Sequence, residues 1–79
     1  MVSPFDEQKV YNTIYSVTNE DNGFCVSGYE NILNLFNGEY TQQDMVDICR
    51  RLNYKDGFKA EEQSYHGAPY IQNIWLKHL

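Results

Sequence analysis

The cysteines and histidines of this sequence, the residue types typical of thiol nucleophiles and zinc sites, are Cys25, Cys49, His66 and His78. Structural zinc sites in small domains usually hold paired ligands at short spacing, such as two cysteines separated by two residues. No such pair occurs here, so a zinc site would require all four residues to converge. Two cysteines are also too few for the disulfide framework of a small secreted domain. The sequence therefore predicts no metal site and no cofactor.

Cys25 is the candidate nucleophile, because it precedes a segment with helical spacing and thiols in front of a helix N-terminus can be activated. Within residues 19–40, Gly23-Phe24-Cys25, a helical segment and Asn37-Gly38-Glu39-Tyr40 resemble the start of papain-like cysteine peptidases, including the josephin type. That resemblance implies Cys25 as nucleophile. Asn19 stands where the family usually has an oxyanion-hole glutamine, and the lobe that carries the catalytic histidine is missing. The alternative interpretation is an apolar thiol that fills a small core, and we expect no enzymatic activity.

Charge and tyrosine content favour a protein partner. Acidic residues outnumber basic ones by 11 to 6, which leaves a net charge of −5, and seven tyrosines help to raise the aromatic content to 15%. A compact acidic body is suited to a basic protein surface, and tyrosine offers contact area at low entropic cost. In size and charge the chain resembles small phage-encoded inhibitors that occupy a partner's nucleic-acid-binding surface. The predicted function is a non-enzymatic, acidic protein-binding module.

The contact face is predicted on the helix that follows Thr41. Asp44 and Asp47 are three residues apart, so a helix places them side by side and away from its apolar stripe. Tyrosines at the two ends of this helix are the expected anchors, because a few buried aromatic residues usually dominate binding. The predicted partner-binding residues are Glu39, Tyr40, Asp44, Asp47, Tyr54, Glu61 and Glu62.

A helix-turn-helix or winged-helix DNA-binding regulator is the alternative function. Residues 41–52, a turn and a late helix or hairpin fit its outline, in which a helix bearing Arg, Lys, Asn or Gln meets base edges. Arg50-Arg51 is the sole basic cluster, and Asp44 and Asp47 lie beside it. Because a chain of net charge −5 is repelled by the phosphate backbone, the sequence argues against nucleic acid as a partner.

Capping signals and apolar spacing predict the elements that position these residues. A first helix is expected over residues 4–18, with Ser3 as its N-cap and Asn22-Gly23 beyond its end. The helix over residues 41–52 has Thr41 as its cap and the most complete apolar stripe. The predicted core contains Val10, Ile14, Ile32, Phe36, Met45, Ile48, Leu52, Ile74 and Trp75.

Between these two helices, a shorter one is expected. Ser27 is its predicted cap, its apolar face begins at Tyr29, and Asn37-Gly38 supplies a left-handed stop. The apolar run at residues 24–26 is either a short strand or a buried connector.

The segment after Pro69 fits two structures. As a helix that begins with Pro69, it places Ile71, Ile74 and Trp75 on one face. In the competing prediction, residues 58–65 and 70–77 form a hairpin around His66-Gly67. The helix is preferred. The predicted fold class is therefore mostly α, a small three- to four-helix domain, with an α+β domain carrying a C-terminal β-hairpin (winged-helix-like) as the alternative.

Length limits the organisation of the chain. With 79 residues there is room for one core, so residues 1–79 are expected to form a single domain. The sequence contains no run of 18 apolar residues and no basic-then-apolar N-terminus. We therefore expect neither a membrane span nor a signal peptide, and a cytoplasmic location.

Overall fold

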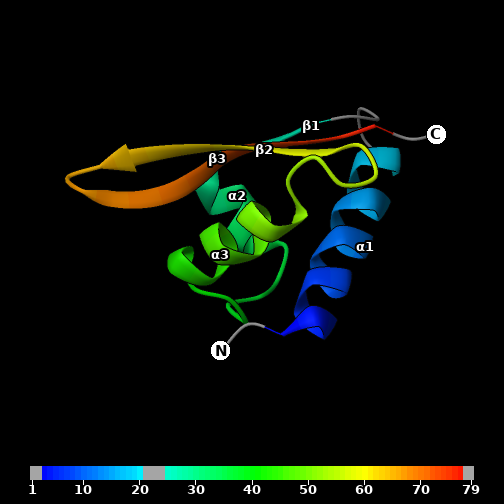
Figure 1. Cartoon of the computed structure of the whole chain (residues 1–79), viewed down its shortest axis with the longest axis horizontal. Coiled ribbons are helices and arrows are strands. Elements are labelled where there is room, and N and C mark those ends of the chain that lie inside the picture. The colour runs from blue at the N-terminus through cyan, green and yellow to red at the C-terminus, as the bar shows by residue number, and fades with distance from the viewer. Residues whose placement is uncertain (1–2, 21–24, 78–79) are drawn as a thin grey trace.

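A computed structural model describes residues 3–20 and 25–77 of the chain, which form a layer of helices against one face of an antiparallel sheet (Figure 1). The helices are α1 (Pro4–Glu20), α2 (Tyr29–Asn34) and α3 (Gln42–Leu52). The strands are β1 (Cys25–Ser27), β2 (Phe58–Tyr65) and β3 (Ala68–Leu76). The strand order is β1-β3-β2, so the last strand in the sequence is the middle one in space.

The last third of the chain forms the β2–β3 hairpin, so the prediction of a mostly α domain with a fourth helix from Pro69 is wrong. The domain is α+β, with which the alternative of a C-terminal hairpin is compatible. The chain turns at His66 and Gly67, whose φ angles of 52° and 79° are those of a tight hairpin turn. Asn-Gly-like sequences favour this turn, and His66-Gly67 acts in the same way.

A bulge in the hairpin explains why the sequence pattern was ambiguous. Glu61 pairs with Asn73 and Glu62 pairs with Ile71, so Gln72 is an extra residue on β3. In a regular strand, residues three apart face opposite sides. Because of the extra residue, Ile71 and Ile74 are both buried beneath the helices. A spacing of three between buried residues is the helical signature that the sequence analysis followed.

Local signals determine α1 and α3. The Ser3 backbone N–H donates to Asp6 Oδ2 at 2.9 Å, at the start of α1, which extends two residues beyond the predicted end. At the start of α3, Asp44 N–H donates to Thr41 Oγ1 at 3.0 Å and Thr41 N–H donates to Asp44 Oδ2 at 3.1 Å. This reciprocal pair is a complete capping box, and it confirms Thr41 as the predicted cap.

The α2 region differs in detail from the prediction. Gly28, with φ 93°, is the N-cap of α2 in place of Ser27, and no side chain caps this helix. The helix ends at Asn34, and the left-handed residues Asn37 and Gly38 follow it, with φ 53° and 78°. The left-handed conformation predicted for Asn37-Gly38 is present, but the helix ends three residues before it. The apolar run before it continues into strand β1, while Phe24 and the predicted stop at Asn22-Gly23 lie outside the described residues.

The core lies between the helices and the inner face of the sheet. Eight of the nine predicted core residues are buried, the exception being Trp75. In β3, Trp75 is on the outer face of the sheet, half-buried, with Lys59 Nζ 5.6 Å from its ring centroid. The fully buried side chains include Val10, Ile14, Ile32, Met45, Ile48, Phe58, Ile74 and Leu76.

The far end of the hairpin extends past the helical layer (Figure 1). Residues 62–68 are exposed. Strand β1 pairs only with Asn73–Trp75 of β3, whereas β2 pairs along its whole length. Within the described part of the chain, residues 68–71 of β3 therefore have β2 on one side and no strand on the other. Helices α2 and α3 begin beside this open edge.

Candidate protein-binding surface

The two aspartates predicted to form the contact face have different roles in α3. Asp44 is half-buried and its carboxylate is part of the capping box with Thr41. Asp47 lies one turn further along, where its Oδ1 accepts a hydrogen bond from Gln43 Nε2 at 3.1 Å. Asp44 thus contributes to the folding of the helix, while Asp47 remains on its polar surface.

Two of the predicted glutamates are compensated by ion pairs. Lys9 Nζ donates to Glu39 Oε2 at 2.7 Å, which connects α1 to the loop before α3. Arg50 makes a two-bond fork with Glu62, with Nε–Oε1 and Nη2–Oε2 distances of 2.7 Å. These hydrogen bonds, and then the positive charge of Arg50, hold the pKa of the Glu62 carboxyl below its usual value. Neither pair presents a net negative charge to a partner.

Glu61 belongs to the other face of the sheet. Its Oε1 accepts a hydrogen bond of 2.5 Å from Asn73 Nδ2, its neighbour on β3. Glu62 pairs with the buried Ile71 and reaches α3, so the two adjacent glutamates point to opposite faces of the sheet, as neighbours on a strand do. A single partner surface would not contact both in the way that the sequence analysis assumed.

The two tyrosines predicted as anchors also differ. Tyr40 is only 8% exposed, packs edge-on to Phe36 at 5.4 Å, and donates from its hydroxyl to Asp6 Oδ1 at 2.8 Å. Burial, and then the bond to Asp6, raises the pKa of the Tyr40 hydroxyl. A backbone hydrogen bond from Ser3, and then the Tyr40 hydroxyl, lowers the pKa of Asp6. Tyr40 therefore joins α1 to the α2–α3 connection, and its ring is not available to a partner.

Tyr54 is the predicted anchor that does lie on the surface. It is 81% exposed and adopts φ 69° in the connection between α3 and β2. The structure therefore does not bring the seven predicted residues onto one acidic face. They are divided among a helix cap, two ion pairs, the core, the outer sheet face, the half-buried polar side of α3 at Asp47, and the exposed Tyr54.

A groove lined by three tyrosines lies elsewhere, beside the open edge of β3. Its volume is about 400 Å³, and it is lined by Tyr29, Gln42, Tyr65, Ala68 and Tyr70. Tyr29 comes from the start of α2 and Gln42 from the start of α3, while the other three come from the end of the hairpin. The rings of Tyr29 and Tyr70 are in contact, with centroids 5.4 Å apart and planes at 60°.

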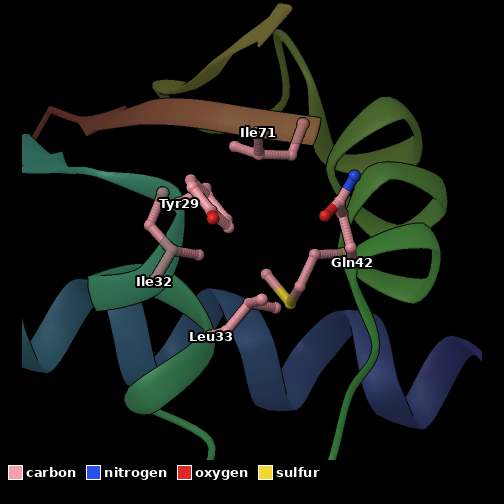
Figure 2. A pocket seen from close by; sticks show the side chains of 6 residues that line it. Tyr29, Ile32, Leu33, Gln42 and Ile71 are labelled. Carbon is pink, nitrogen blue, oxygen red and sulfur yellow. The ribbon is translucent and has the colours of Figure 1, made fainter. Parts of the chain in front are cut away.

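The inner end of the groove rests on the core. A small adjoining pocket of about 10 Å³ is lined by Tyr29, Gln42 and four apolar side chains from α2, α3 and β3. Figure 2 shows Tyr29 and Gln42 facing each other across this pocket, below Ile71 of β3. Because Ile71 is only 3% exposed, the base of the groove is part of the packed interior and is held in place by it.

Hydrogen bonds fix the polar groups of this tyrosine groove. Gln42 Nε2 donates to the carbonyl oxygen of Pro69 at 2.8 Å, which ties α3 to the open edge of β3. The Tyr70 hydroxyl donates to Gln63 Oε1 at 3.1 Å across the hairpin. The Tyr29 hydroxyl donates to Glu30 Oε1 at 3.3 Å. Tyr65 is 69% exposed, and its ring meets His66 edge-on at 4.2 Å.

Sequence reasoning did not identify this groove. It placed Tyr29 on the apolar face of a helix and did not single out Tyr65 or Tyr70. The hairpin alternative was the one feature of the sequence that could have revealed part of the groove. Strands that turn at His66-Gly67 pair Tyr65 with Ala68 and place Tyr70 two residues after Ala68 on the same face. The contribution of Tyr29 and Gln42 depends on tertiary packing.

The geometry around Cys25 differs from that of a thiol nucleophile at a helix N-terminus. Cys25 is half-buried in strand β1, where its Sγ lies 3.4 Å from Ser27 Oγ. It pairs with Trp75, so His66 at the hairpin turn lies roughly 25 Å away at ~3.3 Å per strand residue. His78 lies outside the described residues. Cys49 is buried in the core, and burial raises the pKa of its thiol to about 12.

Within the described ranges, no three His, Cys, Asp or Glu side chains are grouped so that they could hold a metal ion. In the same part of the chain, no helix combines the length and apolar character needed to cross a membrane.

Comparisons of the chain with known protein families, with curated proteins and with solved structures find no match.

Proposed function

We propose that this domain is a non-enzymatic protein-binding module that occupies a basic surface of a partner protein through its tyrosine groove. The observation that carries the proposal is the groove itself, a concave site of about 400 Å³ lined by three tyrosines. Tyrosine is enriched among the residues that dominate binding energy, because it buries a large ring while its hydroxyl stays hydrogen-bonded. A partner's basic surface that normally binds nucleic acid would be blocked by such an occupant.

The net charge of the chain supports a basic partner. Ion pairs of Lys9, Arg50 and Arg51 with Glu39, Glu62 and Glu7 use carboxylates and cations in equal number. They therefore leave the overall charge of −5 unchanged. A field of this sign accelerates encounter with a positively charged surface and is screened by salt. Charge would thus set the association rate, and the tyrosines would supply the contact.

The DNA-binding alternative receives less support. The exposed basic residues of α3 are Arg50 and Arg51, which a recognition helix would need for bases or phosphates. Arg50 is in the two-bond fork with Glu62, and Arg51 Nη1 lies 3.5 Å from Glu7 Oε2. A gel shift at low salt separates the two functions, because even non-specific DNA binding is strongest there.

A reducing, cytoplasmic setting belongs to the same proposal. Both Cys25 and Cys49 are free thiols, which is the usual state in a compartment that contains glutathione and thioredoxin.

Site-specific photo-crosslinking in the native host cells tests the proposal. A photoreactive phenylalanine analogue replaces Tyr65 in the groove, and in a matched variant it replaces Tyr54, which is at least as exposed. We expect a discrete protein adduct from position 65 that is absent from position 54. An adduct of the same partner from both positions, or adducts from neither, would contradict the groove as the binding site.

A further inference from the structure

We infer that the tyrosine groove receives an arginine side chain from a basic segment of the partner. This inference rests on the proposed function, because it specifies which chemistry of the partner the groove recognises. It follows from three properties of the lining: the direction of its hydrogen bonds, the charge around it and the arrangement of its rings.

Most polar side chains of the groove already donate a hydrogen bond to an acceptor of the same chain. The hydroxyls of Tyr29 and Tyr70 donate to Glu30 and Gln63. The side-chain nitrogen of Gln42 donates to the Pro69 carbonyl, and the side-chain oxygen of Gln42 remains as an acceptor. In Figure 2 the Gln42 oxygen points into the space between α2 and α3, while the nitrogen points toward β3. The donors that remain are the Tyr65 hydroxyl and the second N–H of Gln42, whereas the three tyrosine hydroxyl oxygens and the Gln42 oxygen can accept, so acceptors outnumber free donors in the groove.

The charge near the groove is negative, which suits a cationic ligand. None of its five lining residues is charged, and the carboxylate of Glu30 accepts a hydrogen bond from the hydroxyl of Tyr29, one of those five. Three of the described cations, Lys9, Arg50 and Arg51, are paired with carboxylates. Lys55, Lys59 and Lys77 lie at the opposite end of the hairpin, where Phe58 pairs with Leu76. An anionic ligand would meet acceptors and no nearby cation, whereas a cationic ligand would meet a favourable field.

The rings favour arginine among cations. The face of a tyrosine ring attracts a cation that lies within about 6 Å, most often an arginine. The guanidinium group is planar, so it stacks on a ring while its five N–H donors reach acceptors in its plane. Tyr29 and Tyr70 form one wall at 60° to each other, and Tyr65 projects from the end of the hairpin. A stacked guanidinium would thus find ring faces, hydroxyl oxygens and the Gln42 oxygen within one site.

A proline-rich segment is the competing occupant of an aromatic groove. Such a segment presents backbone carbonyls and needs donors from the groove to bind them. The hydroxyls of Tyr29 and Tyr70 and one N–H of Gln42 donate within the chain, which leaves few donors for this ligand. It serves as one arm of the test.

The experiment is a titration of the ¹⁵N-labelled full chain, followed by amide chemical shifts at low and at physiological salt. The probe is the peptide acetyl-Gly-Arg-Gly-Arg-Gly-amide. Matched peptides replace both arginines with lysine, with the neutral isostere citrulline, or with proline. We expect shift changes at Tyr29, Gln42, Tyr65 and Tyr70, and an affinity for the arginine peptide at least about tenfold higher than for the citrulline peptide. The affinity of the lysine peptide should lie between these two, because lysine keeps the positive charge but lacks the planar guanidinium group.

Two variants locate the binding. Tyr65→Ala should weaken binding of the arginine peptide at least fivefold. Tyr54 is at least as exposed but lies outside the groove, so Tyr54→Ala should leave the affinity within twofold. Equal binding of the arginine and citrulline peptides, preferred binding of the proline peptide, or no effect of Tyr65→Ala would overturn the inference. If crosslinking at position 65 succeeds while the arginine peptide fails, the binding module stands and the arginine assignment falls. If both fail, the proposed function falls as well.

Discussion

Reversing the charge of Asp44 should destabilise the domain far more than the same reversal at Asp47. Each change to lysine alters the net charge by the same amount, so the pair is internally matched. At position 44 the substitution removes the carboxylate that accepts the Thr41 N–H and places a cation at the N-terminus of α3. Losing half of the capping box costs about 1 kcal/mol, and the unfavourable dipole adds roughly 0.5–1 kcal/mol.

At position 47 the losses are smaller. The hydrogen bond from Gln43 is an exposed contact between residues four apart, worth a few tenths of a kcal/mol. A lysine there would also lie one turn from Arg51, a repulsion of similar size. The expected free-energy changes of unfolding are therefore about 1.5–2 kcal/mol for Asp44→Lys and about 0.5 kcal/mol for Asp47→Lys.

Thermal unfolding followed by circular dichroism measures this difference. For a chain of 79 residues, 1 kcal/mol corresponds to a change in Tm of roughly 6 °C. We expect a decrease of about 10 °C for Asp44→Lys and about 3 °C for Asp47→Lys, with Asp44→Asn between them because its oxygen can still accept. Equal decreases for the two reversals would refute the capping role of Asp44. Partner binding should accordingly be tested with Asp47→Lys, which leaves the cap intact.

Three further outcomes are expected. Ile48→Ala should lower the free energy of unfolding by about 2–4 kcal/mol, since the side chain is fully buried and truncation leaves a cavity; an unchanged denaturant midpoint would contradict its core position. At pH 8 an alkylating reagent should modify Cys25 before Cys49, whose burial raises the pKa of its thiol to about 12; mass spectrometry of the digested protein would show the reverse order if Cys49 were accessible. Asp6 and Glu62 have pKa values below their usual ones, so their contribution to stability is complete above the unfolded-state pKa of about 4 and is lost as the pH falls through the lower folded value. Urea midpoints between pH 6 and pH 3 should therefore decrease, and a midpoint that rises on acidification would rule out this linkage.

The parts of the fold that were predictable from sequence are those determined by neighbouring residues. The cap of α3 depends on Thr41 and Asp44, three residues apart, and α1 begins at Pro4 after the Ser3–Asp6 pair. The hairpin was assigned to a helix because the bulge at Gln72 is not visible in the sequence. When the bulge is not known, a spacing of three between buried residues at 71 and 74 is explained only by a helix.

The candidate site was less predictable, because its contacts join residues far apart in the chain. Burial of Tyr40 depends on Asp6, and the charge of Glu62 is compensated by Arg50 across the boundary between α3 and the sheet. Exposed acidic residues and tyrosines look alike in a sequence whether they are paired or not. The tyrosine groove also required knowledge of which elements begin beside the open edge of β3.

That open edge affects how the protein behaves at high concentration. An unpaired strand edge is a template for pairing with another chain, and proline is among the residues that block such pairing. Pro69 has no N–H to donate, and Gln42 covers its carbonyl oxygen. Position 69 is thus closed to an incoming strand on both its donor and its acceptor side. This one proline–glutamine contact interrupts the open edge at its centre, so an incoming strand cannot pair continuously along residues 68–71.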